Sequence, residues 1–106
     1  FLDRIYLLES VTLFAEVGIV ALVLNFVIAW GVIDLSVGST TVLVACLYAK
    51  LASAGQSLPV CILAAIGAGA LLGWVNVLLV KLLAAPAFLV TVATLALYRG
   101  VAQVLM

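Results

Sequence analysis

The sequence has very few charged residues. Its 106 residues include four Lys or Arg, four Asp or Glu and no His, whereas about a quarter of an ordinary soluble domain is charged. So few charges cannot cover a globule of this size, so lipid must be the solvent for most side chains. A net charge of zero also leaves no basic patch of the kind that binds nucleic acid. The chain is therefore predicted to be an integral membrane protein.

Residues that build most catalytic and metal sites are also scarce. Without His there is no Ser–His or Cys–His pair, and the only cysteines, Cys46 and Cys61, lie apart in apolar runs. No Gly-x-x-x-x-Gly-Lys phosphate loop occurs. We expect no catalytic residue, no cofactor and no metal, and we expect both cysteines to serve as small packing residues.

The sequence is rich instead in long apolar runs, with 70 % hydrophobic residues and a mean hydropathy of +1.57. A bilayer core requires roughly 20 apolar residues of helix. The runs predict four spans, over residues 11–33, 36–52, 59–80 and 86–106, in one transmembrane domain covering residues 1–106. Because the runs are continuous and do not alternate, the predicted fold is all-α, a polytopic helical membrane protein with a polar, Gly/Ser-rich break after the first helix.

Small residues in the third span suggest close helix packing. Ala65, Gly69 and Gly73 are spaced by four residues and therefore share one helix face. Asn76 continues this face, where an amide in lipid normally bonds to another helix. Packing within the chain is the simpler interpretation, and self-association or a solute contact is the alternative.

Several polar side chains inside the predicted spans need partners. Asn25 is expected to point into the bundle, whereas Glu16 either pairs at the interface or couples transport to a proton or cation. Arg99 must pair or mark the water interface, and it follows a stripe formed by Thr91, Thr94 and Tyr98. The threonine hydroxyls are expected to bond back to the preceding helical turn.

The break itself is the most unusual feature, because a carboxylate, serines and glycines stand between apolar spans with almost no loop. Asp34, Ser36 and Ser39 lie in this segment. We expect the hydroxyl of Ser36 or Ser39 to cap the next helix by accepting a free backbone N–H. Non-helical backbone at membrane depth is tolerated where protein buries it or where it lines a watery cavity.

Four blocks of the sequence together resemble one family. Gly31–Ser39 is similar to the Gly-Gly-Ile-Asp-Leu-Ser-Val-Gly-Ser signature of the permease subunits of sugar ATP-binding cassette (ABC) importers, a family that includes ribose, xylose, galactose and autoinducer-2 permeases. Asn76–Lys81, Pro86–Leu95 and Tyr98–Gly100 resemble further blocks of that family, in the same order. Val32 stands where the signature has its second Gly, and Ala93 also replaces a Gly.

The resemblance implies an importer permease in the bacterial inner membrane and a parent about three times longer, with this piece from its N-terminal half. A second permease subunit, ATP-binding cassette subunits and a periplasmic sugar-binding protein are the implied partners, and the cassette subunits would hydrolyse ATP. We expect the polar residues Asn25, Asp34, Ser36, Ser39, Asn76 and Arg99 to shape the solute pathway or its gate. The piece alone is expected not to fold stably.

Two other functions fit the composition. Small multidrug-resistance exporters have about this length and four spans, and they carry a membrane glutamate in the first helix, the place that Glu16 occupies here. In that interpretation Glu16 would exchange protons for cations, with its pKa raised by desolvation. A membrane scaffold without transport activity is the third possibility.

Overall fold

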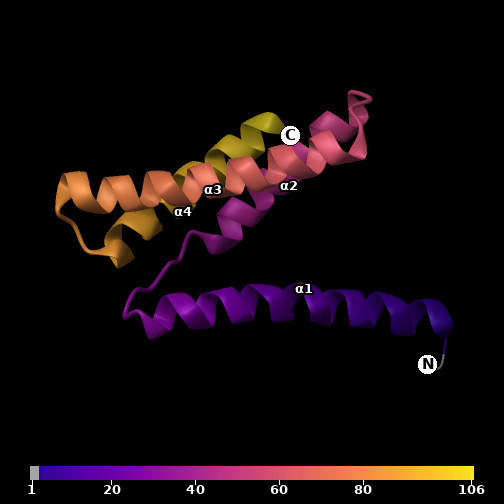
Figure 1. Cartoon of the computed structure of the whole chain (residues 1–106), viewed down its shortest axis with the longest axis horizontal. Coiled ribbons are helices and arrows are strands. Elements are labelled where there is room, and N and C mark those ends of the chain that lie inside the picture. The colour runs from indigo at the N-terminus through magenta and orange to yellow at the C-terminus, as the bar shows by residue number, and fades with distance from the viewer. Residues whose placement is uncertain (1–2) are drawn as a thin grey trace. The chain divides into compact units, whose positions relative to one another are not determined.

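The computed structural model describes residues 3–106, and every regular element within that range is an α-helix. The helices are α1 (Arg4–Ala29), α2 (Val37–Ser53), α3 (Leu58–Leu83) and α4 (Ala87–Leu105) (Figure 1). The predicted all-α fold with a polar break after the first helix is confirmed. The chain forms two compact units, residues 1–32 and residues 33–106.

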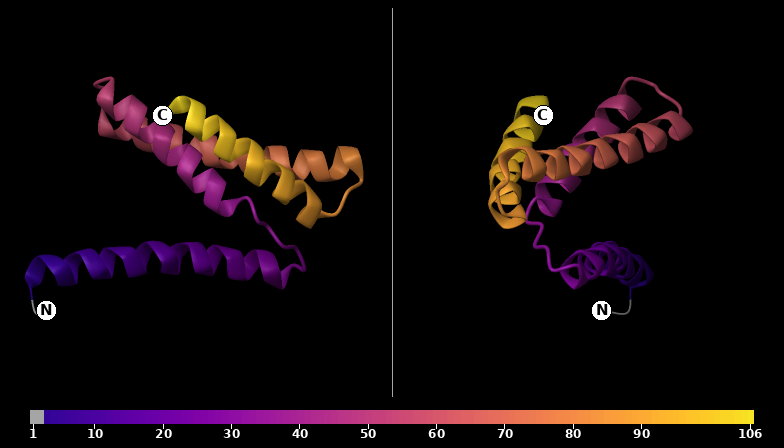
Figure 2. Two further views of the ribbon diagram at one scale, coloured as in Figure 1. Left: turned by 180° about the vertical axis from the view of Figure 1, so that it is seen from behind. Right: turned by 60° about the vertical axis from the view of Figure 1, so that its left-hand side comes forward.

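The second unit is a bundle of three helices. α2 packs against both α3 and α4, and α3 also packs against α4 (Figure 2). The turn between α2 and α3 lies at one end of this bundle and the turn between α3 and α4 at the other, so consecutive helices run in opposite directions. This up-and-down arrangement brings residues near positions 36, 76 and 98 into contact.

Three of the helices, α1, α3 and α4, are long and apolar enough to cross a membrane. α2 has 17 residues, and at a rise of 1.5 Å per residue it extends about 25 Å, less than the roughly 30 Å of a bilayer core. α2 is the shortest of the four described helices and lies at the lower end of the lengths that cross a bilayer core.

Glycines end two of the helices. Gly31 has φ +78° and its N–H donates to the Ile28 carbonyl at 2.8 Å, while the Val32 N–H donates to Val27 at 3.3 Å. This is a Schellman motif, in which a left-handed residue satisfies the last helical carbonyls. Gly55, with φ +82°, closes α2 in the same way. The glycine at position 31 explains why α1 ends at position 29, whereas the sequence placed the end of the first span at 33.

The interior of the bundle is unusually polar, while its exterior is apolar. Of the buried residues in the range 3–106, four are hydrophobic, namely Cys61, Val90, Tyr98 and Ala102, and five are polar, namely Ser36, Ser39, Asn76, Thr91 and Thr94. Large apolar side chains such as Leu63, Trp74 and Leu89 are exposed. Lipid satisfies an apolar exterior, and interhelical hydrogen bonds and small residues then hold the helices together. Cys46 and Cys61 are free thiols within this bundle, at half-buried and buried positions.

Candidate functional site

Asp34 organises the extended segment that leads into α2. Its Oδ1 atom accepts a hydrogen bond from the backbone N–H of Ser36 at 2.8 Å and another from the Ser36 hydroxyl at 2.7 Å. A short acidic side chain that accepts from the backbone two residues later is a local turn former. The pattern of Asp followed by Ser at this spacing therefore sets the direction in which the chain enters α2.

The predicted capping of α2 by a serine hydroxyl is wrong. Ser36 is the N-cap residue, but its side chain makes no capping bond, and its backbone is helical (φ −83°, ψ −5°) rather than extended. A capping hydroxyl usually requires an extended backbone to reach the first free N–H groups. Ser39 also accepts no such bond: its hydroxyl donates to the Ser36 carbonyl at 2.9 Å.

Asn76 and Tyr98 connect the start of α2 to α3 and α4. The Asn76 Nδ2 atom donates to the Ser36 hydroxyl oxygen at 2.8 Å, across 40 residues of sequence. The Tyr98 hydroxyl lies 2.9 Å from the Leu72 carbonyl and 3.3 Å from Asn76 Oδ1, and both oxygens are acceptors. Asp34, Ser36, Asn76 and Tyr98 therefore form one continuous chain of hydrogen bonds, which we call the polar network.

The threonine stripe of α4 holds the same segment. The Thr91 hydroxyl bonds back to the Phe88 carbonyl at 3.1 Å and lies 3.4 Å from the Ile33 carbonyl in the extended segment. The Thr94 hydroxyl donates to the Thr91 carbonyl at 3.2 Å. Both hydroxyls thus bond to the preceding turn, as the sequence predicts, and Thr91 also approaches the break.

Every buried polar side-chain atom in the described part of the chain has a hydrogen-bond partner. Ser36, Asn76 and Tyr98 are 1 %, 7 % and 3 % exposed, respectively. A network that is buried and fully paired has few groups left to bind a solute, and instead it fixes one arrangement of the helices. The polar network therefore acts as a joint that fastens the extended segment to α3 and α4.

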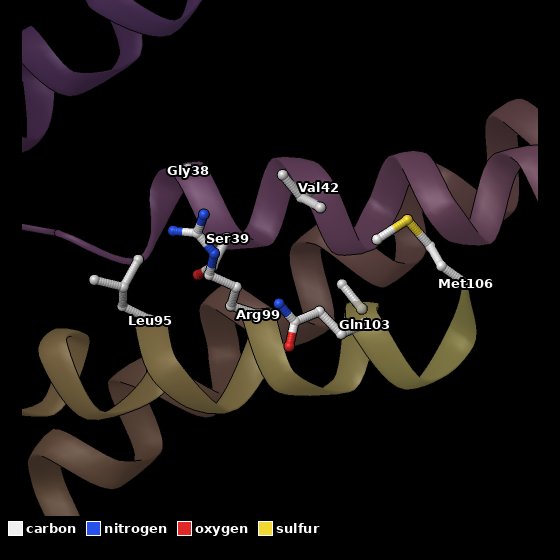
Figure 3. Close-up of a pocket in the computed structure, with 8 residues that line it drawn as sticks. Gly38, Ser39, Val42, Leu95, Arg99, Gln103 and Met106 are labelled. Carbon is white, nitrogen blue, oxygen red and sulfur yellow. The ribbon is translucent and has the colours of Figure 1, made fainter.

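A hollow between α2 and α4 lies next to this joint. It has a volume of about 400 Å³ and is lined by Gly38, Ser39, Val42, Leu95, Arg99, Ala102, Gln103 and Met106. Figure 3 shows the side chains of Arg99 and Gln103 extending from α4 toward α2, with the Arg99 guanidinium beside Gly38 and Ser39. Arg99 and Gln103 are exposed, whereas Ser39 is buried.

The structure thus brings together five of the six predicted pathway residues in two adjoining places. Asp34, Ser36 and Asn76 are in the polar network, and Arg99 is in the hollow. Ser39 adjoins both, since it bonds to the Ser36 carbonyl and lines the hollow. The remaining residue, Asn25, lies on α1 in the N-terminal unit, and its role stays a prediction.

The small residues of α3 differ in their surroundings. A Cβ atom added at Gly69 would lie 3.9 Å from the Val44 side chain of α2, and Ala65 faces a second hollow beside α2. Around Gly73, in contrast, nothing lies within 4 Å of an added Cβ atom. The stripe therefore adjoins α2 over its first part only, and Asn76 bridges to α2 beyond it.

Two residues at these sites, Tyr98 and Gln103, were not among the predicted pathway residues. Tyr98 completes the polar network, and Gln103 contributes an amide to the hollow. Tyr98 was visible as part of the threonine stripe, but its hydroxyl partner on α3 was not. Gln103 lies four residues after Arg99, a spacing that places both on one helix face, and this could have indicated it.

A family model described as "Branched-chain amino acid transport system / permease component" matches residues 6–106. The chain belongs to this permease family. The family indicated by the sequence motifs is thereby confirmed, and the chain is part of a multi-pass membrane transport component. This membership favours an importer permease over an exporter built around Glu16.

Individual relatives agree with the family. The galactofuranose transporter permease protein of Escherichia coli K12 is 40 % identical over 91 residues, which cover 86 % of this chain and 27 % of that protein. An autoinducer 2 import system permease protein of Salmonella paratyphi B is 48 % identical over 69 residues, covering 65 % of this chain and 20 % of its own length. The corresponding protein of Escherichia coli SMS-3-5 is 40 % identical over 106 residues, which cover 95 % of this chain and 31 % of that protein.

The chain spans less than a third of the length of these relatives. No solved structure matches it.

Proposed function

We propose that this chain is part of the membrane-spanning permease of an ABC importer that carries a monosaccharide or a related small polar solute across a bacterial inner membrane. The names of its relatives, permeases for galactofuranose and for autoinducer 2, support this solute class. So do the exposed side chains of Arg99 and Gln103 in the hollow between α2 and α4, which are not part of the polar network.

The observation that carries the proposal is the extended segment at positions 33–36, which the polar network fastens to the helical bundle through the buried Ser36. The Ile33 carbonyl of this segment accepts from Thr91 of α4 and its Ser36 hydroxyl accepts from Asn76 of α3, while the Ser36 N–H bonds within the segment to Asp34. In membrane transporters, unwound backbone between helices occurs where it is buried in protein or lines a cavity, and such breaks are common at transport pathways. The hollow beside Ser39 is consistent with such a pathway.

We further propose the partners that this function requires. A second permease subunit would complete the pathway, ATP-binding cassette subunits would supply the energy, and a periplasmic sugar-binding protein would deliver the solute. The permease itself would catalyse no reaction and would bind no cofactor or metal. The described residues contain no cluster of His, Cys, Asp or Glu that could hold a metal ion.

The gene and its neighbours provide the first test. An open reading frame that continues past position 106, beside genes for a cassette ATPase and a periplasmic sugar-binding protein, would support the proposal. These genes would then be expressed together in a bacterial strain that lacks its own ribose and galactose uptake. We expect uptake of radiolabelled D-ribose or D-galactose that stops when the cassette's ATP hydrolysis is inactivated. Absence of uptake for a panel of pentoses and hexoses would contradict the assigned solute class.

A further inference from the structure

The hollow between α2 and α4 combines polar donors with an apolar wall. Arg99, Gln103 and Ser39 supply the polar groups of its lining, and Val42 and Leu95 are among its apolar residues (Figure 3). A few polar groups in a largely apolar concavity are typical of sites for small molecules, and its volume of about 400 Å³ falls in their usual range.

We infer that this hollow is a subsite for the transported solute, in which Arg99 and Gln103 donate hydrogen bonds to neighbouring hydroxyl groups. A guanidinium presents several N–H donors in a fixed plane and can therefore bind two adjacent oxygens at once. Gln103 adds two more donors and an acceptor one helical turn away. The apolar wall then suits the C–H face of a saturated ring. This inference rests on the proposed function.

The charges of the lining bear on the class of ligand. Arg99 is the single charged residue among those that line the hollow. One guanidinium also pairs well with a carboxylate or phosphate, so the choice of an uncharged, hydroxyl-rich solute rests on the proposed function and on the neutral Gln103 and Ser39 beside it. The occupant is therefore inferred to be a neutral polyol or sugar.

The polar network fixes one wall of this subsite. Ser39 belongs to the first turn of α2, and its hydroxyl bonds to the carbonyl of Ser36, the residue that Asn76 holds. Gly38, which precedes Ser39, also lines the hollow, and a Cβ atom added there would meet open space. A shift of the joint would therefore move Ser39 relative to Arg99 and change how the subsite binds.

Cysteine protection in the complete permease tests the inference. In a background with Cys46→Ala and Cys61→Ala, Val42→Cys places a thiol in the hollow, and Ser57→Cys places one in the exposed turn before α3 as the matched control. The permease is assembled with its cassette and binding protein in proteoliposomes and labelled with a water-soluble methanethiosulfonate. During transport, D-ribose or D-galactose at about ten times the half-saturating concentration is expected to slow labelling of Val42→Cys about tenfold. Labelling of Ser57→Cys should not change.

Arg99 variants separate binding from a structural role. Arg99→Gln removes the charge and the paired donors, so half-protection of Val42→Cys should require about tenfold more sugar. Arg99→Lys keeps the charge but lacks the planar donor pair, so its effect should be intermediate. An Arg99 that only stabilises the bundle would lower the amount of assembled complex and leave the half-protection concentration unchanged, which would refute the inference.

Other outcomes are equally informative. If Val42→Cys reacts only with a lipid-soluble reagent, the hollow faces the bilayer and the inference is wrong. It is also wrong if Val42→Cys reacts with the water-soluble reagent at the same rate with and without sugar while uptake proceeds. If the cysteine-free permease transports none of the sugars although the original permease does, the background is replaced by one with Cys→Ser changes. If the original permease transports no sugar either, the proposed function itself has failed.

Discussion

Removing the amide of Asn76 should weaken the bundle by an amount that the polar network determines. In Asn76→Leu the side chain keeps its approximate volume but loses the 2.8 Å bond to the Ser36 hydroxyl and the 3.3 Å contact with Tyr98. A hydrogen bond between membrane helices contributes about 0.6 kcal/mol on average and up to roughly 1.7 kcal/mol. One short and one long bond should therefore contribute about 1–2 kcal/mol together.

Ser36→Ala should cost more, about 2–3 kcal/mol, although it removes only one oxygen atom. The substitution deletes the bond to Asp34, and it also leaves the Asn76 Nδ2 group buried without its acceptor. A buried donor that loses its partner costs more than the lost bond alone. Tyr98→Phe should lower the unfolding free energy least. It removes one hydroxyl donor, and the groups that lose their partner, the Leu72 carbonyl and Asn76 Oδ1, are acceptors, so no buried donor is left unpaired.

The double variant Ser36→Ala/Asn76→Leu provides the decisive comparison. Because Asn76→Leu removes the donor that Ser36→Ala leaves unpaired, the double variant should be about 1 kcal/mol more stable than the sum of the two single effects. The measurement is the unfolding free energy of the complete permease in mixed micelles at increasing SDS concentration. Val77→Leu, at an exposed apolar position beside Asn76, is the control. Additive effects, or an Asn76→Leu that costs more than Ser36→Ala, would refute the network as we describe it.

Three further predictions use the same unfolding measurement. Gly31→Ala forces a non-glycine residue to φ +78° and should lower the unfolding free energy by about 1–2 kcal/mol. Gly100→Ala, in a helix with open space around it, is the control and should be neutral or stabilising. Equal effects of the two substitutions would contradict the assigned end of α1. Asp34→Asn retains an acceptor for the two Ser36 donors and should cost less than Asp34→Leu. Equal costs would show that the charge, which both variants remove, matters and that the acceptor does not. Gly69→Ala should be tolerated because the new Cβ atom would lie 3.9 Å from Val44, whereas Gly69→Leu should push α2 away and cost about 1–3 kcal/mol.

The fold class could be predicted from the sequence because composition and run length leave few choices in lipid. The continuous apolar runs specify helices, and turn formers such as Gly55 and Gly31 specify where they end. The helices extend beyond the predicted spans where no breaker intervenes: α1 already begins at Arg4, because a helix need not stop at the edge of the hydrocarbon region.

The site could be predicted only in part. Polarity inside an apolar run identified Asp34, Ser36 and Asn76 as residues that need partners, but it did not show that they partner one another. The bond between Asn76 and Ser36 joins residues 40 positions apart and depends on how two helices cross. The hydrogen-bond partners of each hydroxyl also depend on the three-dimensional structure. Ser36, for example, has a helical backbone and bonds to side chains instead of capping α2.

The length of α2 indicates how deep in the membrane the polar network lies. Lys50 and the turn at Gly55 place the far end of α2 near water, and 17 residues carry the helix back only about 25 Å. On α3, Asn76 lies seven residues before the end of the helix at Leu83, so Ser36 is held about 10 Å inside that end. The first turn of α2 therefore begins within the depth of its neighbours, where water cannot satisfy an exposed backbone. Asp34, Asn76 and Thr91 supply the hydrogen bonds that water would otherwise provide, which is why a break at this depth requires polar side chains from the segment itself, from α3 and from α4.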